Sequence, residues 1–273
     1  MTRRVCLAAA VLSLLAFRSS AAPEALRLEL RLGRSEVALG EPIDVAIAFK
    51  NIGDSGLFVE RTRDLGPDHV NIIARRGTCE YALTPSHATM REEDRRFLLT
   101  GLGPRDQLIQ SLPVLNSAEA LGGTDLFFPA PGVYTVISSF RSEGAPTGLG
   151  GVPVWRGVVT SAPVTLTVRA AKPTTLARMR SMLASGSQGD PDLQAVAYFR
   201  YVKDQQAARL LARLLSSAAP NPVLMEAVAW QGRRSDAELL ERHAREQLST
   251  DRRLAEYARD LATRLRERGP CDQ

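Results

Sequence analysis

The segment at residues 127–140, FFPAPGVYTVISSF, constrains the fold of this chain more than any other stretch. Pro131 and Gly132 interrupt the backbone, and the residues after them alternate with a period of two. Because successive side chains of a strand point to opposite faces, one face would carry Tyr134, Val136, Ser138 and Phe140. The segment therefore predicts a central strand of a β-sandwich, entered through a sharp turn.

Tyr134 lies two residues after Gly132, which is the position of the tyrosine in a tyrosine corner. In that motif the ring lies in the core, and the hydroxyl donates a hydrogen bond to the backbone a few residues upstream. The sequence therefore predicts that Gly132 and Tyr134 form a structural corner.

The rest of residues 25–171 predicts further strands around this one. Leucine alternates strictly with charged residues over residues 26–32, and apolar residues alternate again over residues 43–49. Other short apolar runs predict strands at residues 37–39, 57–60, 70–74, 78–83, 97–100, 107–112, 152–159 and 164–168. About eight to ten strands at this spacing are typical of a sandwich.

Residues 173–268 follow a different pattern. After Lys172 the apolar period changes to 3.6, glycine becomes rare, and alanine, leucine and arginine dominate, which predicts six packed helices. The predicted N-caps are Asp190, Asp204, Asn221, Ser235 and Thr250 or Asp251. The predicted fold class is α+β with two domains: a sandwich at residues 25–171, a helical domain at 173–268, and a tail at 269–273.

The helical part also repeats. The tetrapeptide AVAY at residues 195–198 recurs as AVAW at residues 227–230, and Asp204 recurs as Asp236 at the same offset. This period of helix pairs resembles HEAT-like repeats, a resemblance that implies stacked pairs sharing one continuous core. An ordinary small helical bundle is the alternative.

Three segments of the first domain carry a second resemblance: GEPIDVAIAFKNIG, FPAPGVYTVISSF and WRGVVTSAPVTLTV. Together they resemble the early, penultimate and final strands of immunoglobulin-like domains in secreted bacterial proteins. The resemblance covers about residues 25–169 and implies an adhesive, scaffolding or ligand-presenting module, since such sandwiches host many functions. The pair of core cysteines of antibody-type domains is missing here.

The N-terminus predicts export. Arg3 and Arg4 precede an apolar run and then small residues, which is the pattern of a cleaved signal peptide at residues 1–21. No later stretch reaches the ~18 apolar residues of a spanning helix. We therefore expect a periplasmic or secreted protein with no membrane span. Removal of the leader lowers the formal net charge from +5 to +2, which weakens the case for nucleic-acid binding.

Two cysteines remain after removal of the leader, Cys79 and Cys271. An oxidising compartment makes their pairing more plausible than it would be in the cytosol. A disulfide between them would tie the C-terminal tail to the sandwich. Two unpaired thiols are the alternative, because the sequence says nothing about the distance between them.

Three aromatic residues are candidates for an interaction surface. Trp155 lies at the entry to the last predicted strands, and Tyr198 and Trp230 occupy equivalent positions in the helical repeat. For each of them a core position is the favoured interpretation, because a large aromatic side chain is usually buried and finds a partner for its polar atom. No nucleophile, phosphate-binding or metal-binding motif stands out, so we expect no enzyme activity, no cofactor and no metal.

The sequence favours an exported, non-catalytic protein-interaction or scaffolding protein with an unidentified protein partner. One alternative is a protease inhibitor that presents a sandwich loop, with residues 62–68 and 85–96 as the candidate loops. Another is an accessory domain to an extracytoplasmic hydrolase. The oligomeric state does not follow from the sequence.

Overall fold

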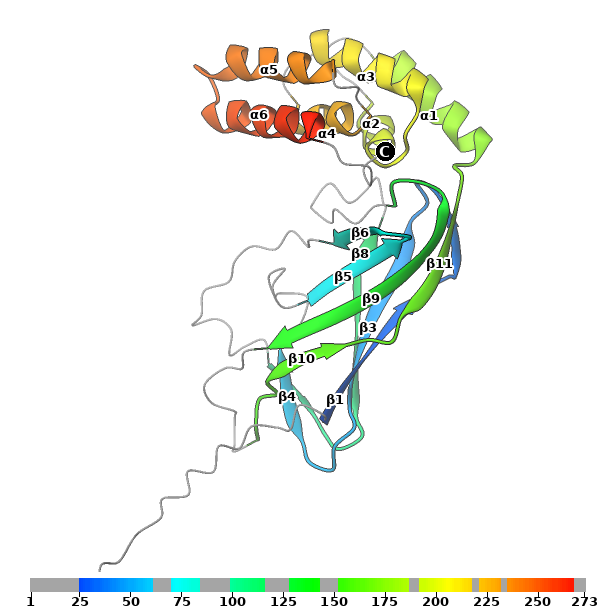
Figure 1. Ribbon diagram of the computed structural model, residues 1–273, viewed down its shortest axis with the longest axis vertical. Coiled ribbons are helices and arrows are strands. Elements are labelled where there is room, and N and C mark those ends of the chain that lie inside the picture. The colour runs from blue at the N-terminus through cyan, green and yellow to red at the C-terminus, as the bar shows by residue number, and fades with distance from the viewer. Residues whose placement is uncertain are drawn as a thin grey trace, which may run out of the picture.

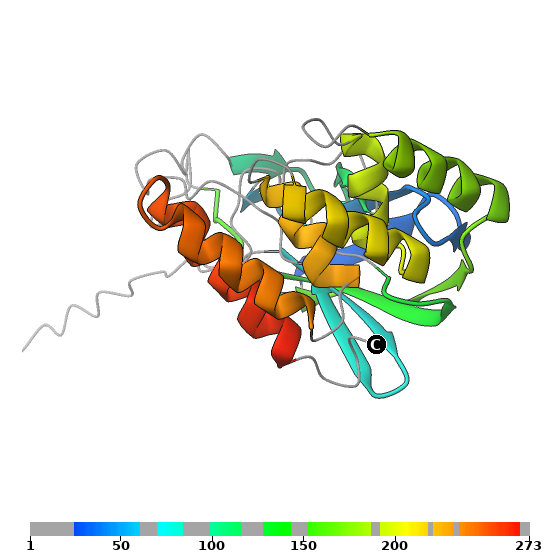
Figure 2. The ribbon, with the colours of Figure 1, turned by 90° about the horizontal axis from the view of Figure 1, so that it is seen from above.

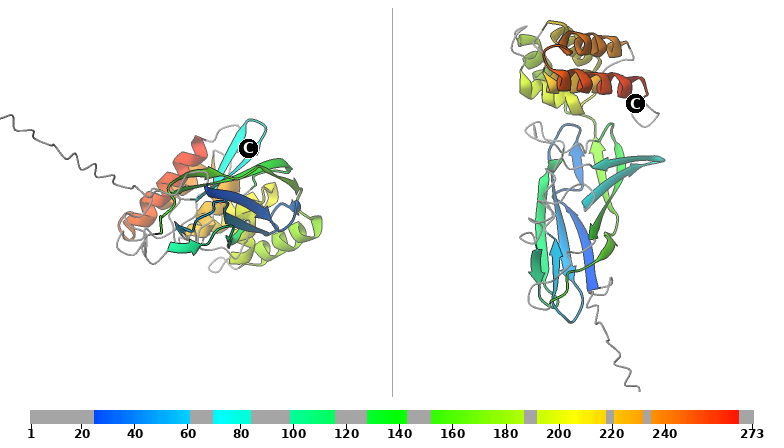
Figure 3. Two further views of the ribbon diagram at one scale, coloured as in Figure 1. Left: turned by 90° about the horizontal axis from the view of Figure 1, so that it is seen from below. Right: turned by 90° about the vertical axis from the view of Figure 1, so that its left-hand side faces the viewer.

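The computed structural model describes residues 25–60, 70–83, 99–115, 128–142, 152–186, 192–217, 221–231 and 235–267. Within these ranges the chain forms eleven strands followed by six helices, so the fold is mixed α+β (Figure 1). We call residues 25–169 the β region and residues 173–267 the helical region. The helices lie together at one end of the strands (Figure 3, right).

The β region contains two larger sheets and one two-stranded sheet. The three-stranded sheet has the order β1-β3-β8, the six-stranded sheet has the order β2-β11-β9-β5-β6 with β10 also on β9, and β4 pairs with β7. The strands are β1 Leu26–Leu32, β2 Glu36–Ala38, β3 Ile43–Asn51, β4 Leu57–Glu60, β5 Val70–Arg76, β6 Cys79–Leu83, β7 Leu99–Leu102, β8 Gln107–Leu115, β9 Gly132–Ser142, β10 Gly157–Thr160 and β11 Val164–Arg169.

Strand β9 is the central strand that the sequence predicts. It pairs with β5, β10 and β11, each antiparallel. Its inward face is buried, whereas Val133 on the other face is 61% exposed. The period-two pattern thus separates a core face from an outer face.

The core of the β region is built from aromatic rings. Phe49 of β3 meets Phe140 of β9 edge to face, with ring centroids 5.0 Å apart. Trp155 stacks on the same Phe140 at 5.7 Å and is 0% exposed. Because Phe49 and Phe140 belong to different sheets, this contact shows that the two larger sheets pack face to face.

The turn before β9 is held by a hydrogen bond from Tyr134. Its hydroxyl donates to the carbonyl oxygen of Ala130 at 2.7 Å, and its ring is 0% exposed. Arg76 Nη1 donates to the carbonyl oxygen of Pro131 at 3.0 Å. A Cβ atom on Gly132 would lie 2.8 Å from Arg76 Cδ, so any side chain at Gly132 would displace this arginine.

The helices are α1 Pro173–Ser185, α2 Leu193–Tyr201, α3 Gln205–Ser217, α4 Pro222–Gln231, α5 Asp236–Gln247 and α6 Arg252–Arg266. Helix α4 packs against α2, α3 and α6, and α5 packs against α6 (Figure 2). Much of the contact is made by alanine, and Ala195, Ala207 and Ala227 are 0% exposed. Small side chains at these positions allow the helices to approach closely.

Three predicted N-caps are confirmed, one is wrong, and Ser235 precedes α5 without a side-chain cap hydrogen bond. The side chains of Asp204, Asn221 and Asp251 each accept a backbone N–H in the first turn of α3, α4 and α6. Asp190, predicted as the cap of α2, lies outside the described residues. Asp192 caps that helix instead, because its carboxylate reaches the amide of Ala195 at 3.0 Å.

The β region and the helical region meet at the turn after β2. A Cβ on Gly40 would lie 2.5 Å from Tyr198 Cε2 and 2.8 Å from Val202 Cγ2, so this turn rests directly on the end of α2. Gly40 also has a φ of 78°, which favours glycine. Beside it, Lys172 Nζ pairs with Glu41 at 2.5 Å. The buried apolar side chains form one continuous cluster that includes both regions.

Candidate functional site

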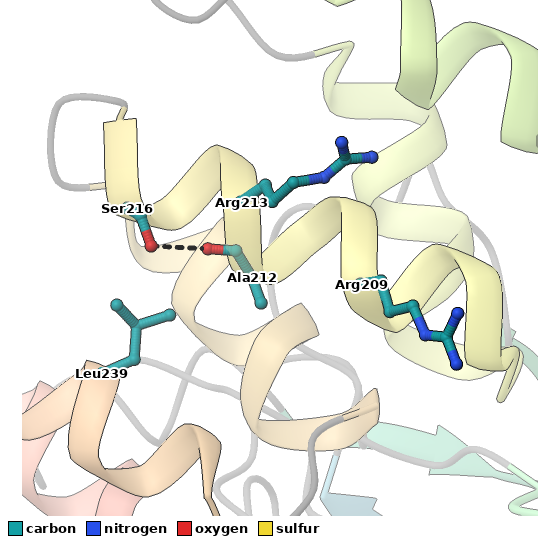
Figure 4. A pocket seen from close by; sticks show the side chains of 5 residues that line it. All are labelled: Arg209, Ala212, Arg213, Ser216 and Leu239. Atoms are coloured by element: carbon teal, nitrogen blue, oxygen red, sulfur yellow. Dashed lines mark hydrogen bonds between the residues drawn. The ribbon is translucent and has the colours of Figure 1, made fainter.

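An open groove of about 630 Å³ lies on the outer surface of the helical region, between α3 and α5. Its lining residues are Arg209, Ala212, Arg213, Ser216 and Leu239. In Figure 4, Leu239 lies across the opening from Ser216, and both arginine side chains reach along α3 toward its N-terminal end. The groove thus combines an apolar wall on α5 with cationic groups on α3.

The spacing of residues on α3 explains this composition. The four lining residues of α3 stand at positions i, i+3, i+4 and i+7, which fall on one side of a helix. The opposite side of α3 packs into the core and includes Leu211 and Leu215, both 0% exposed. Helix α3 is therefore amphipathic, and its polar side forms one wall of the groove.

The charge on α3 is of one sign. Its sequence, QQAARLLARLLSS, contains two arginines and no acidic residue. Arg209 is exposed and has no ion-pair partner among the described residues. The hydroxyl of Ser216 donates to the carbonyl oxygen of Ala212 at 2.9 Å, so its proton is already committed to the helix. The arrangement suits the binding of an anionic group rather than nucleophilic attack.

A smaller pocket of about 300 Å³ adjoins the connection between α2 and α3 and is lined by Lys203, Asp204, Gln205, Ala208 and Gln231. Asp204 accepts a hydrogen bond from Arg180 Nε at 3.0 Å and another from the amide of Ala207 at 2.8 Å. Burial alone would raise the pKa of Asp204, but Arg180 and the amide of Ala207 hold this pKa below its usual range. Asp204 is therefore a fixed carboxylate and not a proton donor near neutral pH.

Gln231 fixes the same connection from α4. Its Oε1 accepts the amide N–H of Asp204 at 2.7 Å, and its Nε2 donates to the carbonyl oxygens of Phe199 and Val202. These bonds satisfy backbone groups where α2 ends and α3 begins. At this pocket, side chains from α1 and α4 therefore hold the α2–α3 connection in place.

A third polar group links α2, α4 and α6. Arg200 Nε lies 2.7 Å from Glu226 Oε2, and the hydroxyl of Tyr257 donates to the other oxygen of Glu226. Burial is the larger cause that raises the pKa of Tyr257 far above its ordinary value, and the hydrogen bond to Glu226 is the second cause. The tyrosine stays protonated and the carboxylate stays paired, so this cluster holds three helices together.

Of the three aromatic interaction candidates, two lie in the interior. Trp155 is 0% exposed, and Tyr198 is 4% exposed beneath Gly40. Their burial agrees with the favoured core interpretation and corrects the possible interaction role, because a side chain enclosed by the protein offers no area to a partner in this structure. Trp230, on α4, is partly exposed. None of the three lines the α3–α5 groove.

Of the two cysteines in the predicted disulfide, Cys79 lies among the described residues. Cys79 is disulfide-bonded and lies at the start of β6. The sequence offers only Cys6 and Cys271 as partners, and both lie outside the described residues. The pairing of Cys79 with Cys271 stays a prediction.

His243 is a core residue of the helical region. It is 5% exposed, and its Nε2 donates to the carbonyl oxygen of Leu215 at 2.5 Å. Within the described ranges, no cluster of three or more His, Cys, Asp or Glu side chains could hold a metal ion. No helix in the same ranges is long and apolar enough to cross a membrane.

The groove residues were not among the sequence candidates. A signal for them exists, because Arg209 and Arg213 stand one turn apart on a helix without acidic residues. The missing information was the position of Leu239, which follows Arg213 by 26 residues that include all of α4. Only the packing of α5 beside α3 brings this leucine to the arginines.

No protein-family model matches the chain, and no curated protein matches it. Among solved structures, the CARDB domain of a Pyrococcus furiosus protein is 14% identical over 53% of this chain and 94% of that chain, with a TM-score of 0.26. A Pseudomonas fluorescens alkylpurine DNA glycosylase is 10% identical over 54% of this chain and 31% of its own, with a TM-score of 0.27.

A β-glucosidase from Listeria innocua is 14% identical over 54% of this chain and 16% of its own, with a TM-score of 0.26. TM-scores of this size do not carry an argument about shared fold or function. The functional conclusion therefore depends on the residues of this chain.

Proposed function

We propose that this chain is an exported, non-catalytic protein that binds a protein partner through the α3–α5 groove. The observation that carries the proposal is the groove itself, in which Leu239 faces a helix whose only charged residues are Arg209 and Arg213. An exposed surface that joins an apolar wall to arginine is typical of a binding interface.

The state of the buried polar groups supports binding over catalysis. Asp204, Glu226 and Tyr257 are each engaged by side chains or backbone of neighbouring helices. Their pKa directions keep the aspartate ionised and the tyrosine protonated, which are resting states rather than states poised for proton transfer.

Export is part of the proposal. The sequence of residues 1–21 favours a signal peptide, and the disulfide at Cys79 fits an oxidising compartment, where such bonds persist. We further propose that residues 25–171 form an immunoglobulin-like β-sandwich domain and that residues 173–268 form a HEAT-like helical domain. In this arrangement the sandwich serves as a scaffold that presents the helical groove.

Capture of a partner tests the function. The mature chain would be immobilised and exposed to periplasmic extract and culture fluid of the source organism, with Leu239→Glu and Leu248→Glu chains in parallel. Leu248 is 49% exposed and does not line the groove, whereas Leu239 is partly buried, so the Leu248 variant matches the change of residue and charge, and the thermal midpoints of both variants must stay near that of the native chain. We expect one stoichiometric protein to be retained by the native and Leu248→Glu chains and lost with Leu239→Glu. Retention by all three chains would contradict the groove as the binding site.

The same experiment separates the alternatives. The inhibitor hypothesis places the binding segment in residues 62–68 or 85–96, which lie outside the described residues. If the retained protein were an active protease whose capture survived Leu239→Glu, that hypothesis would replace ours. Turnover of a substrate panel by the purified chain would contradict the non-catalytic assignment.

A further inference from the structure

One contact between the two walls of the groove depends on a proton. We propose that His243 links α5 to α3 most strongly when its imidazole is charged, so that protonation of this ring stabilises the groove. The proposal rests on the proposed function, since it concerns the regulation of the same groove. It depends on the position of the ring between the two helices, on the two oxygen atoms that face its nitrogens, and on its burial.

His243 joins the two helices that form the groove. Its Nε2 donates to the carbonyl oxygen of Leu215, in the last turn of α3, at 2.5 Å. Leu215 directly precedes the lining residue Ser216. His243 follows the lining residue Leu239 by four positions, so the two residues lie one turn apart on the same side of α5. A change in the His243–Leu215 contact therefore acts on both walls of the groove.

Two oxygen acceptors face the ring, one for each nitrogen. Nε2 meets the carbonyl oxygen of Leu215, and Nδ1 lies 3.9 Å from Oε2 of Glu246, three residues further along α5. A neutral imidazole has one N–H group and one lone pair, whereas a charged imidazole has two N–H groups. The neutral ring can therefore donate to only one of these two oxygens, and the charged ring can donate to both.

Burial makes this difference costly. His243 is 5% exposed, and its Nδ1 is buried with no hydrogen-bond partner among the described residues. When the neutral ring donates to Leu215, the lone pair of Nδ1 is removed from water and faces a carboxylate, which costs free energy. When the neutral ring instead carries its proton on Nδ1, it gives up the bond to α3. A second proton removes this conflict, and the C-terminal end of α3 also favours a positive charge beside Leu215.

Among the described residues, Glu246 is the charged side chain that pairs with the ring. Helix α4 has one charged residue, Glu226, which is bonded to Arg200 and Tyr257. Every charged residue of α6 is exposed, and its buried positions are alanine and leucine. The remaining charged residues of α3 and α5 are Arg209 and Arg213 on the groove side of α3, Asp236 two turns before His243, and Glu238, Glu241, Arg242 and Arg245 on the outer side of α5.

Two glutamate variants separate the effect of this pair from a general change of charge. The side chain of Glu246 is 56% exposed, so Glu246→Gln should fold normally. The new amide can donate to a neutral Nδ1, and it no longer attracts a charged ring. Glu238→Gln makes the same change of charge at an exposed residue of the same helix that does not pair with His243. It is therefore the matched control.

Hydrogen exchange of the full mature chain measures the contact without a partner. Protection factors of the backbone amides of α5 and of the last turn of α3, corrected for intrinsic exchange, would be compared at about pH 5.5 and about pH 7.5, on either side of the range in which histidine changes charge. We expect protection to be about tenfold greater at the lower pH in the native and Glu238→Gln chains, because a hydrogen bond to a charged group is lost at the higher pH. The difference should fall below about threefold in Glu246→Gln.

Two methyl-bearing lining residues, Leu239 and Ala212, report on the groove itself. In an NMR titration of the same chain, their methyl signals should move with the same midpoint as the ring signal of His243. This ring signal is identified by its absence in His243→Gln, since the sequence contains only two further histidines, His69 and His87.

Three outcomes would overturn the proposal. These are an equal pH response in the two glutamate variants, methyl signals of Leu239 that do not follow the ring, and a ring of His243 that keeps one charge state throughout the titration. The proposed function fails separately. If partner capture survived Leu239→Glu while the groove signals followed His243, the pH dependence would stand and the groove would not be the binding site. If capture required Leu239 but exchange was the same at both pH values, only the regulation by His243 would be wrong.

Discussion

The β region and the helical region are held together in different ways. In the β region, backbone hydrogen bonds join neighbouring strands, as in the ladder of β5 on β9, and large rings such as Phe49, Phe140 and Trp155 fill the space between sheets. In the helical region each helix satisfies its own backbone. The helices contact through alanines together with larger side chains such as Phe199 and Leu211, and side-chain bonds cross between them at Asp204 and Glu226.

This difference indicates which residues set the structure in each region. A strand is positioned by its ladder, so most of its side chains need only fill the core. A helix has no such bond to its neighbour, and its rotation is set by packing and by a few polar contacts. The polar clusters of the helical region therefore set the positions of its helices. Four predictions test this difference between the β region and the helical region.

The largest effect is expected from the aromatic core of the β region. Trp155→Ala would leave a cavity beside Phe140, and we expect a loss of about 3–5 kcal/mol in the free energy of unfolding, measured by urea titration. Trp230→Ala in the helical region is the matched substitution. Because Trp230 is partly exposed, its loss should be smaller. Equal losses of unfolding free energy in the two variants would contradict the difference between the interiors of the β region and the helical region.

A polar contact should matter more between helices than between strands. Glu226 has a side chain only 20% exposed and is bonded to Arg200 and Tyr257, so Glu226→Ala should lower the free energy of unfolding by about 1.5–3 kcal/mol. Glu80 pairs with Arg75 across the β5–β6 hairpin, where both side chains are about half exposed. Glu80→Ala should therefore cost less than about 1 kcal/mol. A larger loss for Glu80→Ala would contradict the comparison.

Two buried tyrosines offer the sharpest paired test. Tyr134 donates to the carbonyl oxygen of Ala130, and Tyr134→Phe should lower the free energy of unfolding by about 0.5–1.5 kcal/mol. The hydroxyl of Tyr198 is buried and has no hydrogen-bond partner among the described residues. Tyr198→Phe should therefore leave stability unchanged or raise it slightly. If Tyr198→Phe were the more harmful change, the hydroxyl of Tyr198 would have to have a partner.

The smallest effect on stability is expected from lowering the pH. Arg180 and the amide of Ala207, acting against burial, lower the pKa of Asp204 in the folded protein. A group with a lowered folded pKa contributes stability that is complete above its unfolded pKa, about 3.9, and is lost as the pH falls through the folded value. Helical circular dichroism should thus show a loss of stability in this acidic range. Asp204→Asn should flatten this dependence, and an identical acid profile in both chains would contradict the role of Asp204.

Much of the fold could be predicted because its signals are local. The alternation of leucine with charged residues places β1 at Leu26–Leu32, as observed, and the change of period after Lys172 marks the start of the helices. Caps were predictable at Asp204, Asn221 and Asp251, since each needs only its own first turn. The same rule failed at Asp190 because Asp192 offers a second carboxylate closer to the helix.

The features that were missed depend on contacts between residues far apart in the sequence. A core position for Tyr198 could be expected from the repeat, but its contact with Gly40, which belongs to the β region, could not. In the sequence, Glu226 is a single charged residue in an apolar helix. Its partners Arg200 and Tyr257 come from α2 and α6, and only the packing of these helices brings them to it. The groove needs Leu239 beside α3. In each case a periodic pattern predicts which face of one element is buried, but it does not predict which other element packs against that face.

The pairing of β2 with β11 has a consequence for mechanical load. These strands run parallel, with Thr167 opposite Glu36 and Arg169 opposite Ala38, and only residues 170–172 separate β11 from α1. A pull on the helical region directed away from the other end of the β region would slide β11 along β2. The hydrogen bonds between β11 and β2 lie across the direction of such sliding and share the load, whereas peeling would break them one after another. A partner held in the helical groove could therefore be pulled against the β region without first opening its strands.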